Sequence, residues 1–205
     1  MQSAPQEGVI ETRYPGTCRG RFASLEQAEH TTRKPAGLRF RVPEGPVTIL
    51  DGFAAPLTAD VQREVGDFLV ARRDKTPAYQ LAVVVDDAHQ GVNEVLRGDD
   101  LLASTARQWH LQEALGLPHP VWIHVPLVLD ERGQRLAKRT DALSLQALRE
   151  RGVDPRAVVA WAARSAGQPC EGLLHPSGVV HTFDLSRLPP NPVRLTADEI
   201  ARLTG

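Results

Sequence analysis

The fold of this chain is decided by the apolar run Val121-Trp122-Ile123-His124-Val125-Pro126-Leu127-Val128-Leu129 and by the cationic loop Arg135-Leu136-Ala137-Lys138-Arg139 that follows it. The run is long enough for a central strand, and Pro126 predicts a bulge or an early end within it. A mobile loop that carries a lysine is suited to placing positive charge on the phosphates of a nucleotide. Taken alone, such a loop is more often a solvated turn, so its interpretation depends on its neighbours.

Shorter strands and helices are expected on both sides of this run. Strands are predicted at 37–42 and 47–51, joined as a hairpin, and at 67–71, 79–85 and 93–97. Residues 79–85 are mostly apolar, as in a strand covered on both faces. Helices are predicted from Thr105, whose capping box includes Gln108, to Gly116, and at 142–152, 154–167 and 197–203. This order of strand, helix, strand, loop and helices predicts half of an α/β nucleotide-binding fold.

Composition excludes several classes of protein. The chain has 205 residues, of which 41% are hydrophobic and 24% charged, as in an ordinary globular protein. No apolar run approaches the roughly 20 residues of a membrane helix, and the N-terminus lacks the basic and apolar regions of a signal peptide. Two cysteines are too few for a disulfide scaffold, which predicts a cytoplasmic location. A formal charge of -1 does not indicate nucleic-acid binding, although a neutral total can conceal a basic face.

Two residues at the ends of the predicted strands are candidates for binding a carboxylate. Arg97 precedes Gly98 and offers a planar fork of donors, and the hydroxyl of Tyr79 can add a directional hydrogen bond. Composition alone favours the simpler interpretation, in which Tyr79 packs in the core and Arg97 pairs with a neighbouring aspartate. Asp86-Asp87 is open to two interpretations, as a contact to Mg²⁺ or ribose, or as a turn former and helix cap.

Metal-binding patterns are incomplete. Tyr14 and Cys18 enclose a tight turn and supply at most half of a four-ligand zinc site. The seven histidines show no paired metal spacing and are interpreted as surface residues or as satisfied core residues.

Three segments together resemble a known family. Residues 79–87, 95–105 and 135–139 resemble, in this order and at these separations, the second half of the catalytic domain of the glutamyl-tRNA synthetases. The closer resemblance is to the short glutamyl-Q tRNA(Asp) synthetases, which lack an anticodon-binding domain. The resemblance covers roughly residues 10 to 200. It implies the C-terminal part of a class I, Rossmann-type catalytic domain with a small inserted β-containing subdomain and C-terminal helices.

The resemblance also implies an activity and a set of site residues. Members of this family are ligases that activate glutamate with ATP and Mg²⁺ and transfer it to the queuosine base of tRNA(Asp). Tyr79 and Arg97 then correspond to glutamate-binding residues. The 135–139 loop corresponds to the ATP-binding KMSKS loop, with Lys138 as its catalytic lysine and Ala137 in place of the usual serine. Tyr14 and Cys18 correspond to the last two ligands of the family's zinc site. A monomer without membrane contact is expected.

The resemblance suggests four regions along the chain. Residues 1–36 correspond to a remnant of the zinc-binding region and a linker, and residues 37–78 to the inserted subdomain with its hairpin. Residues 79–167 correspond to the second half of the catalytic domain, and residues 168–205 to a C-terminal extension. The family's Gly-rich HIGH segment and Cys-x-Cys pair have no counterpart in residues 1–13. The chain is therefore expected to be truncated and inactive alone; the alternative is a non-catalytic remnant that binds tRNA or a protein.

Overall fold

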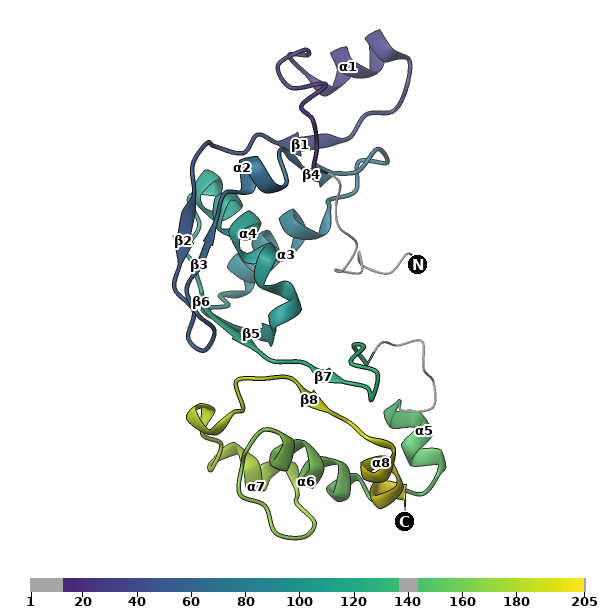
Figure 1. The fold of residues 1–205 in the computed structure, drawn as a ribbon. Coiled ribbons are helices and arrows are strands. Elements are labelled where there is room, and N and C mark those ends of the chain that lie inside the picture. Colours follow the sequence, from purple (N-terminus) through teal and green to yellow (C-terminus); the bar gives the residue numbers. More distant parts are fainter. Residues whose placement is uncertain (1–12, 137–143, 205) are drawn as a thin grey trace. The chain divides into compact units, whose positions relative to one another are not determined.

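The computed structural model describes residues 13–136 and 144–204. The chain forms two compact units, one up to His124 and the other from Val125 onward. The decisive run 121–129 therefore contributes to both units (Figure 1). This boundary lies inside the 79–167 region of the sequence analysis, and the four-region division remains a prediction.

Three pairs of strands form the β structure of the first unit. Strand β1 (Leu38–Phe40) pairs antiparallel with β4 (Phe68–Ala71), and β2 (Val47–Ile49) pairs antiparallel with β3 (Leu57–Ala59). Strand β5 (Glu94–Gly98) pairs with β6 (Val121–Val125). The expected hairpin between 37–42 and 47–51 is wrong, because each of those strands has another partner. Beyond β1, the backbone N–H of Val42 donates to Asp67 Oδ1 at 3.1 Å, which holds the chain against the residues before β4.

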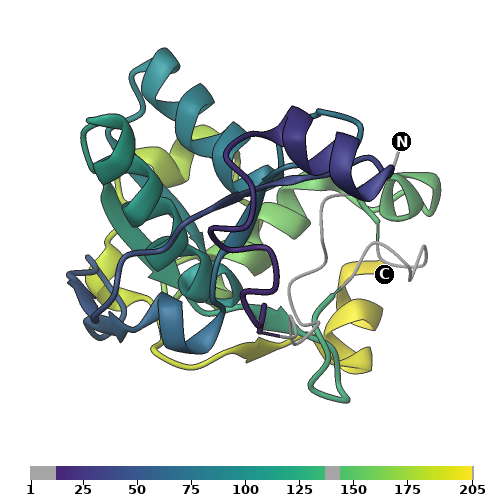
Figure 2. The same ribbon diagram turned by 90° about the horizontal axis from the view of Figure 1, so that it is seen from above.

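Helices α1 (Leu25–Thr32), α2 (Val61–Glu64), α3 (Tyr79–Gln90) and α4 (Leu102–Leu115) complete the first unit. The β1–β4 pair lies between α1 on one side and α3 and α4 on the other (Figure 1). Figure 2 shows the same ribbon from above, from the side on which α1 lies. No helix is predicted from the sequence within the 1–36 region of zinc-site remnant and linker, so α1 was missed. Ser24 caps this helix, because its hydroxyl accepts from the N–H of Gln27 at 3.2 Å.

The strand predicted at 79–85 is wrong, because these residues form the first two turns of α3. Valine and leucine suit a buried strand, and a short apolar run does not by periodicity alone distinguish a strand from a buried helix. The helix continues through 90 and ends at Gly91, whose φ of 71° gives the left-handed C-terminal cap. Helix α4 also begins earlier than predicted, at Leu102, so Thr105 lies inside it instead of capping it.

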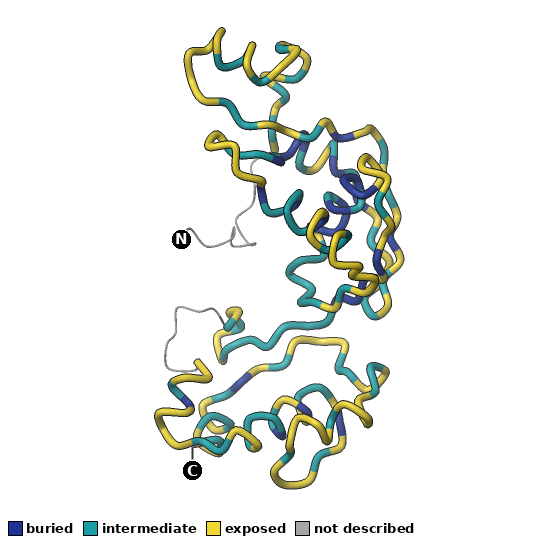
Figure 3. Tube along the Cα trace, turned by 180° about the vertical axis from the view of Figure 1, so that it is seen from behind, coloured by how far each residue is buried: buried dark blue, intermediate teal, exposed yellow. Residues whose placement is uncertain are grey.

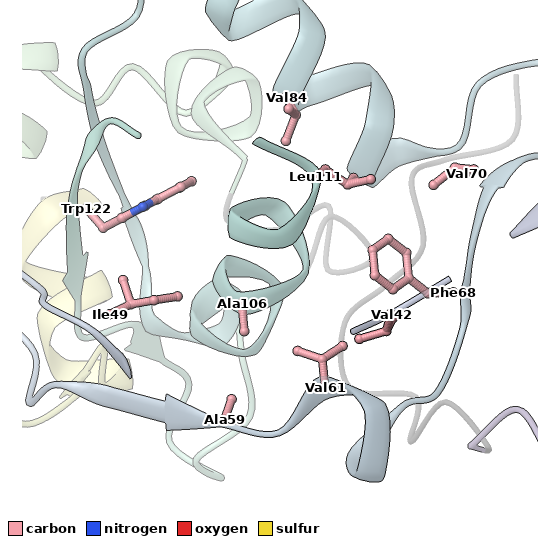
Figure 4. Packing of buried hydrophobic residues seen from close by; sticks show 10 residues of the cluster. All are labelled: Val42, Ile49, Ala59, Val61, Phe68, Val70, Val84, Ala106, Leu111 and Trp122. Atoms are coloured by element: carbon pink, nitrogen blue, oxygen red, sulfur yellow. The ribbon is translucent and has the colours of Figure 1, made fainter. Parts of the chain in front are cut away.

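The apolar core of the first unit lies between the helices and the strands. Buried segments are concentrated in this unit (Figure 3). Figure 4 shows the cluster, which consists of Val42, Ile49, Ala59, Val61, Phe68, Val70, Val84, Ala106, Leu111 and Trp122. Burying side chains of this size stabilises a fold by about 1.5–3 kcal/mol each, so this cluster fixes α4 against β2, β3 and β6.

Among its described residues, the second unit has four α-helices and one parallel pair of strands. Strand β7 (Val128–Leu129) pairs parallel with β8 (Val193–Arg194). The helices are α5 (Leu145–Glu150), α6 (Pro155–Ser165), α7 (Pro176–Val180) and α8 (Ala197–Thr204). The predicted interruption at Pro126 is confirmed, since β6 ends at Val125. The predicted caps are confirmed too: Asp154 accepts from the N–H of Arg156 at 2.8 Å, and Thr196 from that of Glu199 at 3.3 Å.

Candidate functional site

Arg97, near the end of β5, is the centre of a polar network inside the first unit. Its Nε donates to His124 Nε2 at 3.0 Å, its Nη1 to Gln108 Oε1 at 2.9 Å and its Nη2 to the hydroxyl of Thr105 at 2.8 Å. The guanidinium carbon lies 4.7 Å from the centre of the Trp122 ring, a cation–π contact. Arg97 itself remains partly exposed. The network therefore holds a positive charge in one orientation at the edge of the core.

His124, on β6, is joined to the loop after β2. Its Nδ1 lies 2.5 Å from Asp51 Oδ2, and both side chains are almost fully buried. The other carboxylate oxygen, Oδ1, accepts from the backbone N–H groups of Phe53, Ala54 and His124 at 2.8–3.0 Å. Burial raises the pKa of Asp51, but the hydrogen bonds from the His124 ring and from these N–H groups outweigh it and lower the pKa below its ordinary value. Asp51 is therefore a buried carboxylate in its charged form.

Two glutamines connect Arg97 to the start of α3. Gln108 Nε2 donates to Gln80 Oε1 at 2.9 Å, and Gln80 Nε2 donates to the hydroxyl of Ser104 at 2.9 Å. All three side chains belong to buried residues. Because Gln80 follows Tyr79 directly, the network ties the first turn of α3, where Tyr79 lies, to the guanidinium of Arg97.

The structure places the predicted carboxylate-binding pair as follows. Tyr79 is partly buried and begins α3, whereas the sequence predicted it as the first residue of a strand. Arg97 lies in β5, directly before Gly98, as predicted. Binding of glutamate by either residue remains a prediction.

Asp86 and Asp87 do not follow a strand, because both lie in the third turn of α3. Asp86 is exposed. Burial, opposed by the charge of Arg97 and reinforced by that of Asp86, raises the pKa of Asp87. Within residues 13–136 and 144–204, no group of three or more His, Cys, Asp or Glu side chains is arranged to hold a metal ion.

The cationic loop is described only at its start. After β7 the chain turns back at Asp130, whose N–H donates to Gln134 O at 2.8 Å and whose Oδ1 accepts from the N–H of Gln134 at 2.7 Å. This turn pairs Arg135 with Leu129 in an antiparallel bridge. Arg135 is exposed and Leu136 partly buried, whereas Ala137, Lys138 and Arg139 lie outside the described residues.

Tyr14 and Cys18 are close to each other but do not make up a zinc site. The hydroxyl of Tyr14 accepts from the backbone N–H of Cys18 at 2.7 Å, and Cys18 is an exposed free cysteine. A structural zinc site needs four ligands, mainly Cys and His. Residues 1–12 contain neither, so the residues of this region supply two donors and do not fit the metal.

A second feature of the first unit is a pocket of about 970 Å³ beside α1 and the β1–β4 pair. Its charged lining is mostly cationic. The cations are Arg19, Lys34, Arg39, Arg41, Arg72 and Arg73, and the acids are Asp67 and Asp74. Arg19 and Arg39 are anchored, since Arg19 forms an ion pair with Asp67 and Arg39 stacks on the Tyr14 ring at 4.1 Å. These cations are scattered along the sequence between positions 19 and 73, and folding brings them together around one pocket.

Sequence reasoning missed the residues that hold Arg97. The interpretation of the histidines as satisfied core residues is correct for His124, but it hid that residue's contact with Arg97. Asp51 and Gln80 carried no pattern that marks them, and their partners lie 73 and 28 residues away. The available signal was the spacing of Arg97, Thr105 and Gln108, which places the last two on a helix directly after the arginine's strand.

The chain is similar to proteins of one family. The family model of the catalytic domain of class I tRNA synthetases (E and Q) matches residues 2–198. The glutamyl-Q tRNA(Asp) synthetase of Symbiobacterium thermophilum is 44% identical over 195 residues, which are 94% of this chain and 59% of that protein. Those of Nitratidesulfovibrio vulgaris and Nocardia farcinica are 40% and 45% identical, over 99% and 89% of this chain. The chain spans 57% to 63% of the length of these relatives.

Solved structures share the fold. The glutamate-tRNA synthetase of Elizabethkingia anophelis superposes with a TM-score of 0.72 at 21% identity, over 87% of this chain and 40% of that one. A glutamate tRNA ligase from Elizabethkingia meningosepticum, solved in complex with its amino acid, gives the same TM-score and identity over 87% of this chain and 39% of that one. This similarity agrees with the mixed α/β architecture expected from the sequence.

Proposed function

Because this chain belongs to the family of class I tRNA synthetases (E and Q), of whose catalytic domain it is a part, we propose that it serves the activation of glutamate by ATP and the transfer of the glutamyl group to queuosine in tRNA(Asp). The relatives that are named glutamyl-Q tRNA(Asp) synthetases support glutamate as the substrate and tRNA(Asp) as the RNA. The observation that carries the proposal is the guanidinium of Arg97, which three side-chain hydrogen bonds hold in place and which Gln108 links to Gln80 in the first turn of α3.

The proposed first step is an in-line attack of a glutamate carboxylate on the α-phosphorus of ATP. It forms glutamyl-adenylate and releases pyrophosphate; transfer to the RNA then releases AMP. Catalysis of such a step consists mainly of positioning the reactants and stabilising the developing charge. Arg97 and Tyr79 hold the glutamate, and the loop from Arg135 to Arg139 meets ATP, with Lys138 at the phosphates.

Binding of glutamate is the first test, because it does not require the chain to complete the reaction. Isothermal titration of the 205-residue chain with L-glutamate should give saturable binding, with D-glutamate and L-aspartate as weaker ligands. Arg97→Lys keeps the charge but loses the planar fork of donors, so affinity should fall by roughly 10- to 100-fold, the value of a lost hydrogen bond to a charged group. Equal affinity in this variant would remove Arg97 from the proposed site.

Chemistry is tested by exchange of labelled pyrophosphate into ATP in the presence of glutamate, and by transfer of labelled glutamate to tRNA(Asp) with and without queuosine. Transfer should depend on queuosine. Where exchange is measurable, Lys138→Ala should slow it by about 10²–10³-fold, as for the loss of one preorganised donor. Unchanged exchange in Lys138→Ala would exclude the loop from the reaction.

The cytoplasmic location and the monomeric state of the protein remain predictions.

The cationic pocket supports a second candidate, a chain that binds RNA without chemistry. The pocket lining has six cations against two acids, which suits a phosphate backbone. The two candidates differ in one observable: binding of tRNA with neither glutamate binding nor pyrophosphate exchange would favour the second.

A further inference from the structure

The hydrogen bonds of His124 determine which of its ring nitrogens carries the proton. An arginine side chain has no acceptor, so in the 3.0 Å contact between Arg97 Nε and His124 Nε2 the histidine must accept. The proton of the neutral ring is then on Nδ1, which donates to Asp51 Oδ2 at 2.5 Å. Arg97, His124 and Asp51 thus form a directed relay of hydrogen bonds, in which the guanidinium donates to the imidazole and the imidazole donates to the buried carboxylate.

We propose that Asp51 and His124 are positioning residues for Arg97: Asp51 keeps His124 in the tautomer that accepts from Arg97, and this orients the guanidinium toward the glutamate carboxylate. The last clause rests on the proposed function. The hydrogen-bond relay itself rests on the distances between these three side chains and does not depend on which ligand Arg97 binds.

The two oxygens of Asp51 have separate tasks. Oδ1 organises the backbone, since it accepts from the N–H groups of Phe53, Ala54 and His124. Oδ2 meets the imidazole ring. A substitution that preserves Oδ1 and changes Oδ2 therefore separates the relay from the local fold.

Asp51→Asn is that substitution. The amide oxygen can keep the place of Oδ1, whereas the amide nitrogen replaces Oδ2 and donates where Oδ2 accepted. His124 Nδ1 then has to accept, so the ring proton moves to Nε2 and faces the N–H of Arg97. Two donors facing each other cannot form a hydrogen bond, and the guanidinium loses its partner at Nε. Fixing a histidine tautomer with a buried aspartate is an established way of orienting an imidazole.

Nitrogen-15 NMR of the 205-residue chain tests the tautomer directly. In the wild-type chain the His124 ring should show a protonated Nδ1 and a bare Nε2, and in Asp51→Asn the reverse. Hydrogen exchange at Arg97 Nε should accelerate by roughly 10- to 100-fold in the variant, as expected for the loss of one hydrogen bond to a charged group. A protonated Nε2 in the wild-type chain, or an unchanged tautomer in Asp51→Asn, would overturn the proposal.

Asp67→Asn is the matched control. Asp67 is also buried in the first unit and also accepts a backbone N–H, from Val42, but the cation that it pairs with is Arg19 and not a histidine ring. This variant should leave the His124 tautomer and the exchange at Arg97 unchanged. A tautomer change in the control would mean that any lost buried charge has the same effect, which contradicts a specific relay.

A double-mutant cycle separates positioning from mere support of the fold. In His124→Gln the amide oxygen accepts from Arg97 Nε without any tautomer, so Asp51→Asn should have no further effect on the exchange at Arg97 in that background. An equal effect of Asp51→Asn in both backgrounds would show that Asp51 acts on Arg97 by another route and would refute the relay.

Titration with L-glutamate distinguishes this proposal from the proposed function. Asp51→Asn should weaken glutamate binding by roughly tenfold or more, and His124→Gln should weaken it less. Wild-type affinity in Asp51→Asn with a reversed tautomer would overturn the positioning role. If the wild-type chain does not bind glutamate, the proposed function fails, and the tautomer and the exchange at Arg97 still decide the relay.

Discussion

Gln108, in the middle of α4, joins two partners at once: its Nε2 donates to Gln80 Oε1, and its Oε1 accepts from Arg97 Nη1, both at 2.9 Å. Gln108→Leu would keep the volume and remove the partner of two polar groups, the buried amide of Gln80 and the partly exposed guanidinium of Arg97. Each lost partner costs about 1–3 kcal/mol, so we expect the free energy of unfolding in urea to fall by about 2–6 kcal/mol. Gln146→Leu is the control, because Gln146 is exposed in α5 and its amide donates to the exposed Glu150; this variant should change stability by no more than about 0.5 kcal/mol.

Gly167, just after α6, is close to the chain before Pro189. Its φ is 72°, and a Cβ there would lie 2.1 Å from the carbonyl oxygen of Arg187. Gly167→Ala should therefore cost about 3 kcal/mol or more, since backbone must move in addition to the strain of the left-handed conformation. Gly152→Ala separates the two effects: Gly152 has a φ of 74° but no heavy atom within 4 Å of the added Cβ, so its cost should be about 1–2 kcal/mol. Thermal unfolding of the two variants measures the difference, and equal losses would contradict the close approach to Arg187.

Asp51 should make the stability of the chain depend on acid pH. Its pKa is lowered in the fold, so the stabilisation from its ionised form is complete above its ordinary pKa of 3.8 and is lost as pH falls through the lower value of the folded state. The difference in unfolding free energy between the wild-type chain and Asp51→Asn should be constant from pH 7 to about 5 and shrink below about pH 4. A difference that stays constant down to pH 3 would show that folding does not lower the pKa of Asp51.

The cationic pocket should contribute to RNA affinity with a measurable salt dependence. Removing two cations with Arg72→Ala and Arg73→Ala should lower the slope of log affinity against log salt by about 1–2, since each lost phosphate contact lowers it by about 0.7–0.9. A filter-binding titration of tRNA at several salt concentrations measures this slope. Arg63→Ala with Arg149→Ala removes the same charge from exposed positions outside the pocket. Equal slopes for the two double variants would mean that net charge, and not the pocket, determines binding.

Local signals predicted the elements whose boundaries depend on neighbouring residues. Asp154 and Pro155 marked the start of α6, Thr196 the start of α8 and Pro126 the end of β6, because caps and proline act within one helical turn or one strand. The strands at 67–71 and 93–97 were also predicted closely.

The prediction failed where distant contacts decide. The apolar residues 79–85 suit a strand and become α3 because Val84 packs into the core and Gln80 bonds to α4. The sequence predicted Thr105 as a helix cap, but it lies inside α4 and its hydroxyl accepts a hydrogen bond from Arg97. For the pairing of β1 with β4, the partner is 30 residues away, and no local pattern specifies it.

The sequence by itself determined the family and the position of Arg97 at the end of a strand, because these depend on the order and spacing of residue types along the chain. Only the tertiary structure decided that Asp51 and His124, 73 residues apart, meet beside Arg97. The physical reason is burial: a charge at the edge of an apolar core needs several fixed partners, and here those partners come from β2's loop, α3, α4 and β6, which only folding brings together.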